Sequence, residues 1–141
     1  HTETVLSVAV DASGNVYSAS LDDTVKKIDS EGNIVWTFTG HTDSVFSVAV
    51  DELGNVYSGS SDQTVKKIDS EGNIVWTFNT GSSLVFGVSV DQSGNVYAAS
   101  FSDNEVIKLD SDGNELWTFT GHTNSTRSVA VDPGVYPIFW S

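Results

Sequence analysis

The sequence contains no cysteine and no methionine, and only two of its 141 residues are proline. Without cysteine the chain forms no disulfide and no thiolate zinc site, and its redox compartment stays undecided. No apolar stretch reaches the ~18 residues that a membrane-spanning helix requires. We therefore expect a soluble chain, with no signal peptide or transmembrane segment in the sequence given, and its cellular localisation stays unknown.

Positive charge is also scarce. Five lysines and one arginine stand against 19 acidic residues, which gives a formal net charge of −13 at pH 7. This balance argues against nucleic acid or an anionic membrane surface as the main partner, because both repel a strongly acidic chain. It suits a cation or a basic protein as a partner, and it equally suits a solvated acidic surface that binds nothing.

The sequence does contain a repeat of about 40 residues. Residues 1–40 recur almost unchanged as 41–80, recur more loosely and with one inserted residue as 81–121, and restart as 122–141. A period of this length is typical of solenoids, propellers and other arrays. We therefore divide the chain into three complete repeats and a half-repeat that supplies the first two strands of a fourth.

Each complete repeat predicts four short strands. In the second repeat they are 44–50, 56–60, 64–68 and 74–78, separated by turns rich in Asp, Gly and Asn. The turn signals recur every 8–12 residues and no helical period is present, so the fold class is all-β. A four-stranded meander cannot bury both of its faces alone, and it must stack on its copies as the blades of a β-propeller do.

Two side chains recur where neighbouring blades should meet. The fourth strand of each repeat carries a tryptophan, which suits packing between blades: Trp36, Trp76 and Trp117. The third strand of each repeat carries a lysine: Lys27, Lys67 and Lys108. We expect each lysine stem to lie along a neighbouring sheet while its ammonium pairs with a carboxylate.

The Gly-His-Thr corner at 40–42, its copy at 121–123 and the stretch 58–66 resemble the WD repeat. In that family a histidine, a strand-two hydroxyl residue and a turn aspartate bond to one another inside each blade. The resemblance implies this structural role for the matching residues: His41, Ser58, Asp62 and His122. The Trp-Asp pair that names the family is replaced by Ile-Asp at 68–69.

Other parts of the unit resemble two further kinds of propeller blade. The Asp69-x-x-Gly72-x-x-x-Trp76 spacing, followed by Thr77-Phe78, resembles the tryptophan-docking motif of pyrroloquinoline-quinone-type (PQQ-type) repeats. The stretch 48–57 is similar to NHL-type repeats. These resemblances cover nearly the whole chain and imply a propeller, a fold that hosts enzymes, lectins and scaffolds alike.

Three and a half blades do not close a ring, because propellers typically have four to eight blades. We expect either a fragment of a longer propeller or a homodimer whose two halves complete a ring of seven blades. An apolar stretch at the end of the sequence suits an assembly contact: Pro137, Ile138, Phe139 and Trp140. A tail folded back on its own blade, or a junction with foreign sequence, would explain the same residues.

No catalytic or metal-binding motif stands out. The three histidines lie at repeat starts, no serine lies in a Gly-x-Ser-x-Gly elbow, and the turn at 110–114 lacks the spacing of a calcium loop. We therefore expect no enzyme activity, no cofactor and no metal.

The turns between strands two and three should share one face with the connections between blades, and the candidate ligand-binding residues lie there: Asp43, Phe46, Asp62, Gln63, Phe101, Asp103 and Arg127. Most of the differences between repeats lie in these turns, as a bound partner that breaks the symmetry would require. Sequence drift in unconstrained loops explains the same differences.

The leading hypothesis is a non-enzymatic interaction scaffold that assembles from repeated blades, with itself and another protein as partners. One alternative is a lectin-like propeller that binds glycans through one shallow pocket per blade, because near-identical blades favour multivalent binding. Another is a piece of a quinoprotein-type enzyme. This fits least, since such enzymes need asymmetric residues around one cofactor.

Overall fold

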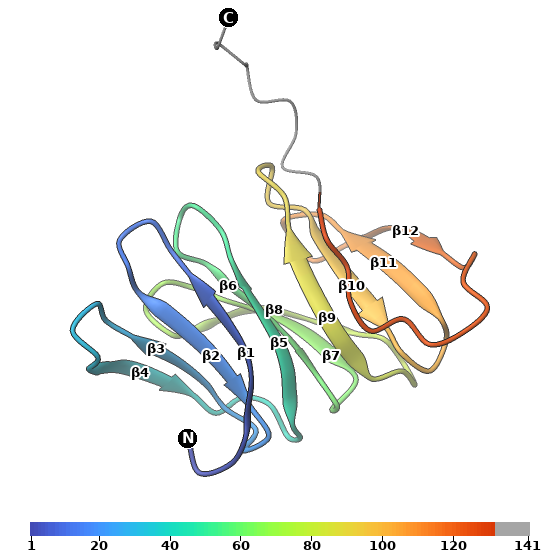
Figure 1. The fold of residues 1–141 in the computed structure, drawn as a ribbon. Helices are drawn as coiled ribbons and strands as arrows, with labels where there is room; N and C mark the ends of the chain where they lie inside the picture. Colours follow the sequence, from blue (N-terminus) through green and yellow to red (C-terminus); the bar gives the residue numbers. More distant parts are fainter. Residues whose placement is uncertain (132–141) are drawn as a thin grey trace, which may run out of the picture.

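Three four-stranded antiparallel sheets stand side by side in the computed structural model, which describes residues 1–131 (Figure 1). Each sheet is a meander in chain order, and no helix occurs within this range. Blade 1 comprises β1 (Val5–Val10), β2 (Val16–Ser20), β3 (Val25–Ile28) and β4 (Ile34–Phe38). Blade 2 comprises β5 (Val45–Val50), β6 (Val56–Ser60), β7 (Thr64–Ile68) and β8 (Ile74–Asn79). Blade 3 comprises β9 (Val85–Val90), β10 (Val96–Ser100), β11 (Glu105–Leu109) and β12 (Glu115–Phe119).

An aspartate fixes the turn between the first two strands of every blade. In blade 2, Asp51 accepts hydrogen bonds from the backbone N–H groups of Leu53 and Asn55, each at 2.9 Å. Its second carboxylate oxygen accepts from the Asn55 amide and from the Tyr57 hydroxyl, also at 2.9 Å. Gly54 takes the positive φ of 83° that the turn requires. The turn therefore aligns the two strands and anchors the buried tyrosine.

A second polar network in blade 2 joins the connection before β5 to β6 and to the turn between β6 and β7. The Nδ1 atom of His41 lies 2.7 Å from the carboxylate of Asp62, and its Nε2 atom lies 2.7 Å from the hydroxyl of Ser58. Because a carboxylate only accepts, Nδ1 carries the proton and Nε2 accepts from the serine. Blade 1 repeats the network through His1, Ser18 and Asp22. The network implied by the WD-repeat resemblance thus forms without the tryptophan of that family.

Blade 3 lacks the histidine and uses a different anchor. Gly81 stands at the histidine position, and the hydroxyl of Ser83 instead accepts from the backbone N–H groups of Ser102 and Asp103, at 2.8 and 3.3 Å. Ser83 is fully buried. A hydroxyl in the blade connection therefore replaces the histidine in holding the longer turn of this repeat.

The hydrophobic core lies between blades. One cluster joins Ala19, Val25 and Phe38 of blade 1 to Val45 and Val48 of blade 2. A second cluster repeats this arrangement between blades 2 and 3. Each blade buries its faces only against a neighbour, as the sequence predicts.

Residues 121–131 do not form the expected first strand of a fourth blade. They lie along β9 (Figure 1), with the carbonyl oxygen of Arg127 2.9 Å from where a Cβ on Gly87 would lie. A strand needs a hydrogen-bonding neighbour, and the second strand that should supply it lies outside the described residues. The predicted assembly residues, 137–140, also lie outside them.

Candidate functional site

The seams between blades contain the most regular contacts in the molecule. The indole Nε1 of Trp36 donates to the carbonyl oxygen of Ser70 in blade 2 at 3.1 Å. Trp76 donates in the same way to Ser111 in blade 3 at 3.0 Å. Each indole also covers a glycine of the same turn, Gly72 or Gly113. At the two internal seams these tryptophans thus lie between blades and bond to the neighbouring blade.

The recurrent lysines have a different partner from the one expected. Lys27 and Lys67 donate to the carbonyl oxygens of Ser70 and Ser111 at 3.4 and 3.3 Å, the same oxygens that the indoles bind. Each ammonium also lies over a tyrosine ring of its own blade, 5.7 Å from the ring centre. No lysine among the described residues lies within ion-pair distance of a carboxylate, because the nearby aspartates are already engaged in their own turns. The predicted ion pair is therefore wrong.

The two end faces of the three-bladed array lack such a neighbour. Val8 of β1 is 64% exposed, whereas its counterparts Val48 and Val88 are only 5% and 7% exposed. At the other end, Trp117 and Phe119 are 44% and 49% exposed, whereas Phe38 in blade 1 is 7% exposed. The same sequence positions are thus buried at internal seams and exposed at the two ends.

An aromatic stack crosses the first strands near the connections between blades. The rings of Phe46 and Phe86 stack face to face, with centres 4.2 Å apart and planes 5° apart. Phe86 also contacts Phe101 at 4.6 Å, and the guanidinium of Arg127 lies 5.4 Å from the centre of the Phe101 ring. Three of the predicted ligand-binding residues, Phe46, Phe101 and Arg127, are therefore brought together. Sequence reasoning missed Phe86, although it occupies the position of Phe46 one repeat later.

The remaining predicted ligand-binding residues serve the turns. Asp62 belongs to the His41 network, and its side chain is only 6% exposed. Burial would raise the pKa of Asp62, but hydrogen bonds from His41, Thr64 and the Thr42 backbone outweigh it and hold the pKa well below its usual value. The carbonyl oxygen of Gln63 accepts from Thr80, and Asp43 and Asp103 are exposed beside the blade connections.

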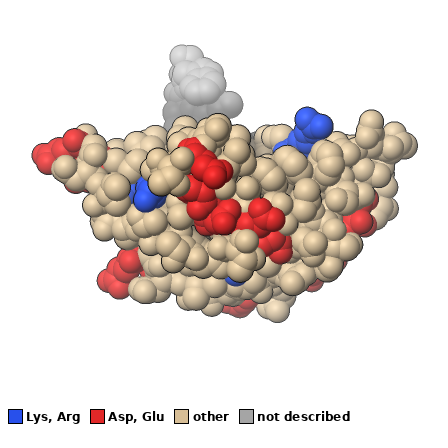
Figure 2. All heavy atoms as spheres, turned by 90° about the horizontal axis from the view of Figure 1, so that it is seen from below, with Lys and Arg blue, Asp and Glu red and all other residues tan. Residues whose placement is uncertain are grey.

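Acidic side chains gather on the face that carries these turns. Figure 2, which views the molecule from below, shows them across the middle of this face with few basic atoms. The second-to-third-strand turns and blade connections contribute them: Glu3, Asp23, Asp43, Asp103 and Glu105. The arrangement favours a cationic or basic partner over an anionic one.

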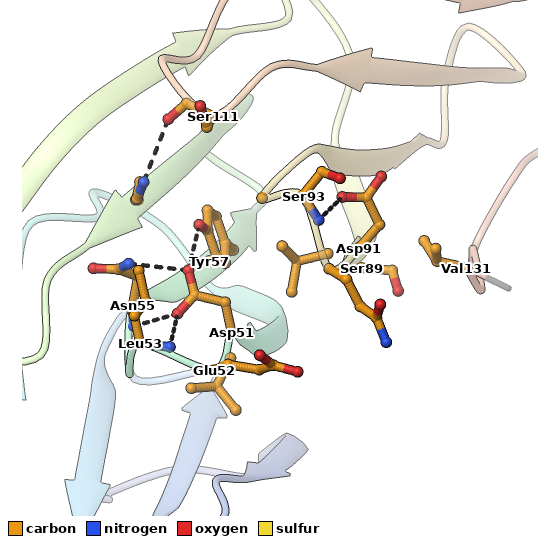
Figure 3. A pocket seen from close by; sticks show the side chains of 15 residues that line it. Asp51, Glu52, Leu53, Asn55, Tyr57, Ser89, Asp91, Ser93, Ser111 and Val131 are labelled. Carbon is orange, nitrogen blue, oxygen red and sulfur yellow. Dashed lines mark hydrogen bonds between the residues drawn. The ribbon is translucent and has the colours of Figure 1, made fainter. Parts of the chain in front are cut away.

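A pocket of about 550 Å³ opens on the opposite face, between blades 2 and 3 (Figure 3). Asp51, Tyr57, Lys67, Asp91 and Ser111 line it. The figure shows Asp51 turned toward Tyr57 and the backbone of its own turn. Burial and the hydrogen bond to Asp51 raise the pKa of Tyr57 far above its usual value, so the phenol stays protonated. In this pocket Tyr57 is bound to Asp51 and Lys67 to the Ser111 carbonyl. A hollow at the equivalent place between blades 1 and 2 marks the pocket as a feature of each seam.

Residues 2–135 match the sequence model of a family described as outer membrane protein assembly factor BamB, a family of PQQ-type repeats. The chain belongs to this family. The fold is therefore a β-propeller. The match also confirms that this chain resembles PQQ-type repeats, as the sequence around Trp76 predicts. No curated protein sequence matches the chain.

Two further observations on this BamB-family chain concern membrane-spanning helices and metal sites. None of the described residues forms a helix long and apolar enough to cross a membrane. In the same part of the chain, no three His, Asp or Glu side chains gather as a metal site would require.

Proposed function

We propose that the chain is a non-enzymatic propeller scaffold that assembles with a second copy of itself. The observation that carries the proposal is the contrast between equivalent positions: Val8 is 64% exposed where Val48 is 5% exposed, and Trp117 is exposed where Trp36 and Trp76 are bound. Two end faces built from the sequence of an internal seam are complementary to each other. Burying both requires a closed ring, and propellers close with four to eight blades.

The acidic turn face is the proposed contact for a further protein partner. Its carboxylates, together with a net charge of −13, favour a basic protein surface. The aromatic stack beside it supplies apolar area, with Phe101 under Arg127 at its edge. The family description names an assembly factor, and such a role is exercised by binding and needs no catalytic residues.

Light scattering on a sizing column, across a concentration series, tests the assembly. We expect a folded particle of twice the 15.1 kDa chain mass. A folded particle of one chain mass at all concentrations would contradict the proposal. Binding of the same sample to glycans, without binding to basic proteins, would favour the lectin alternative.

A further inference from the structure

The two internal seams are copies of one docking site. In each, an indole of one blade covers a glycine of the next blade and donates to the serine carbonyl two residues before that glycine. A Cβ on Gly72 would lie 3.0 Å from the ring of Trp36, and a Cβ on Gly113 would lie 2.7 Å from the ring of Trp76. Only a glycine lets the indole approach so closely.

Within residues 1–131, one copy of each half of this site is unused. Trp117 stands at the free face of blade 3 and is 44% exposed. Gly32 stands in the free turn of blade 1, with the same left-handed conformation as Gly72 (φ of 88° and 91°), and nothing lies within 4 Å of where its Cβ would be. The turn sequence Asp-Ser-Glu-Gly-Asn at 29–33 is identical to that at 69–73.

We propose that Trp117 of one chain docks on Gly32 of a second copy and donates its indole hydrogen bond to the Ser30 carbonyl of that copy. This inference rests on the assembly proposed above and specifies where the two chains meet. The contact is head to tail, because blade 3 of each chain binds blade 1 of the other. Two such contacts close a ring of two chains.

The surrounding side chains match the internal seams as well. Lys108 lies over the ring of Tyr97 at 5.3 Å, as Lys67 lies over that of Tyr57, and it is therefore placed to donate to the same Ser30 carbonyl. Apolar residues that form a buried cluster at each internal seam are left in two separate halves at the ends: Phe119, exposed on blade 3, and Val16 and Ile28, half-buried on blade 1 where Val56 and Ile68 of blade 2 are fully buried. Docking joins these halves into a third cluster.

The segment 125–131 gives the shared blade its first strand. It already lies along β9, and Thr126 is buried there as Val45 and Val85 are at the same position of β5 and β9. Residues 122–131 are identical to 1–10 at six of ten positions, so the segment can pair with β2 of the second copy in place of β1. Exchange of an equivalent strand between copies is a low-cost route to a dimer. The two-chain ring then has six blades, in place of the seven expected from a half-blade in each chain.

Cysteine cross-linking tests the contact directly, because the chain has no cysteine of its own. At the internal seam a Cβ on Gly72 would lie 3.4 Å from the Cβ of Trp36, close to the spacing of a disulfide. We would mix a Trp117→Cys chain with a Gly32→Cys chain, oxidise the mixture and separate it without reductant. We expect a disulfide-linked pair of chains in the mixture and little or none in either variant alone.

The matched control is the double variant Trp36→Cys/Gly72→Cys, which should close a disulfide within one chain and lose both free thiols. If this control closes, the wild type has the mass of two chains and the mixture does not cross-link, the Trp117–Gly32 contact is overturned while the assembly stands. If Trp117→Cys alone cross-links to itself, the contact is face to face and the inference is also overturned. A single-chain mass for the wild type overturns the assembly itself.

A second variant keeps the indole site testable if the cysteine chains fold poorly. Trp117→Phe retains an aromatic ring but loses the N–H donor at both contacts of the ring, so we expect the dissociation constant of the two chains to rise about fivefold per contact, or about 25-fold in all. An unchanged dissociation constant would contradict the hydrogen bond to Ser30.

Discussion

The indole Nε1 of Trp76 donates a hydrogen bond to the carbonyl oxygen of Ser111, which lies 3.0 Å away in the next blade. This single bond joins the fourth strand of one repeat to the last turn of the following repeat. The same pair recurs one blade earlier as Trp36 and Ser70. The repeat is therefore a unit of docking between blades as well as a unit of folding.

Two substitutions of Trp76 should separate the stability that comes from packing of the indole from the stability that comes from its hydrogen bond. We expect Trp76→Ala to lower the free energy of unfolding by about 2–3 kcal/mol, because the ring is half-buried against the next blade. Trp76→Phe should cost only about 1 kcal/mol, since Lys67 still donates to the Ser111 carbonyl. Urea unfolding followed by circular dichroism measures both. Equal losses for the two variants would contradict this division.

Gly72 should be less replaceable than a glycine of the same backbone conformation elsewhere. Gly72→Ala introduces a side chain at a φ of 91° and only 3.0 Å from the ring of Trp36. Gly81→Ala is the matched control, because its φ is 90° and nothing lies within 4 Å. Both should lose about 1–2 kcal/mol to the left-handed backbone, and Gly72→Ala should lose about 1 kcal/mol more. Equal unfolding midpoints would contradict this expectation, because they would show that the Trp36 ring moves away from the added methyl group with no loss of stability.

Acid should destabilise the fold through its hydrogen-bonded aspartates. Burial would raise the pKa of Asp62, but hydrogen bonds from His41 and Thr64 outweigh it, and the pKa in the folded state lies below the ordinary value of 3.8. The pKa values of Asp11, Asp22 and Asp91 are lowered in the same direction. The folded state therefore binds fewer protons than the unfolded state, so this stability is present above about pH 4 and is lost as the pH falls further.

The variant Asp62→Asn tests this pH dependence at one residue. It should lose about 2 kcal/mol of unfolding free energy at neutral pH, because it weakens a charge-assisted hydrogen bond to His41. The difference from the wild type should shrink below about pH 4, where the wild-type carboxylate also becomes protonated on unfolding. Urea unfolding at several pH values measures it. A difference that stays constant from neutral to acid pH would contradict the assignment.

The stack of Phe46 on Phe86 should contribute coupling energy beyond the area it buries. A double-mutant cycle with Phe46→Leu and Phe86→Leu uses the residue that blade 1 carries at this position, Leu6. We expect a coupling free energy of about 1 kcal/mol, because parallel rings 4.2 Å apart interact more than their burial alone accounts for. Additive losses in urea unfolding would show that the two rings merely share a surface.

The sequence predicts the strands and turns well because their signals are local. The expected strands 56–60 and 64–68 coincide with β6 and β7, and the other two strands of that repeat differ from β5 and β8 by one residue. Alternation of side chains and the Asp-x-x-Gly turns act within a few residues, so they can be recognised without the fold.

The contacts that depend on tertiary packing were harder to predict. The sequence places Asp62 both on the ligand face and, through the WD-repeat resemblance, in a network with His41, and only the fold shows that the network holds its side chain. The expected carboxylate partner of Lys67 is a backbone carbonyl in the next blade, which no residue pattern reveals. Phe86 joins Phe46 only because neighbouring blades place their first strands side by side.

The most direct test of the assembly is hydrogen exchange of the tryptophan indole N–H groups, followed by nuclear magnetic resonance. Trp36 and Trp76 should exchange slowly, because each N–H is bound to a carbonyl in the next blade. At concentrations where two chains associate, we predict that the Trp117 indole, assigned through Trp117→Phe, exchanges as slowly as these two. Exchange of Trp117 at the rate of a free indole, while Trp36 and Trp76 remain protected, would contradict the account.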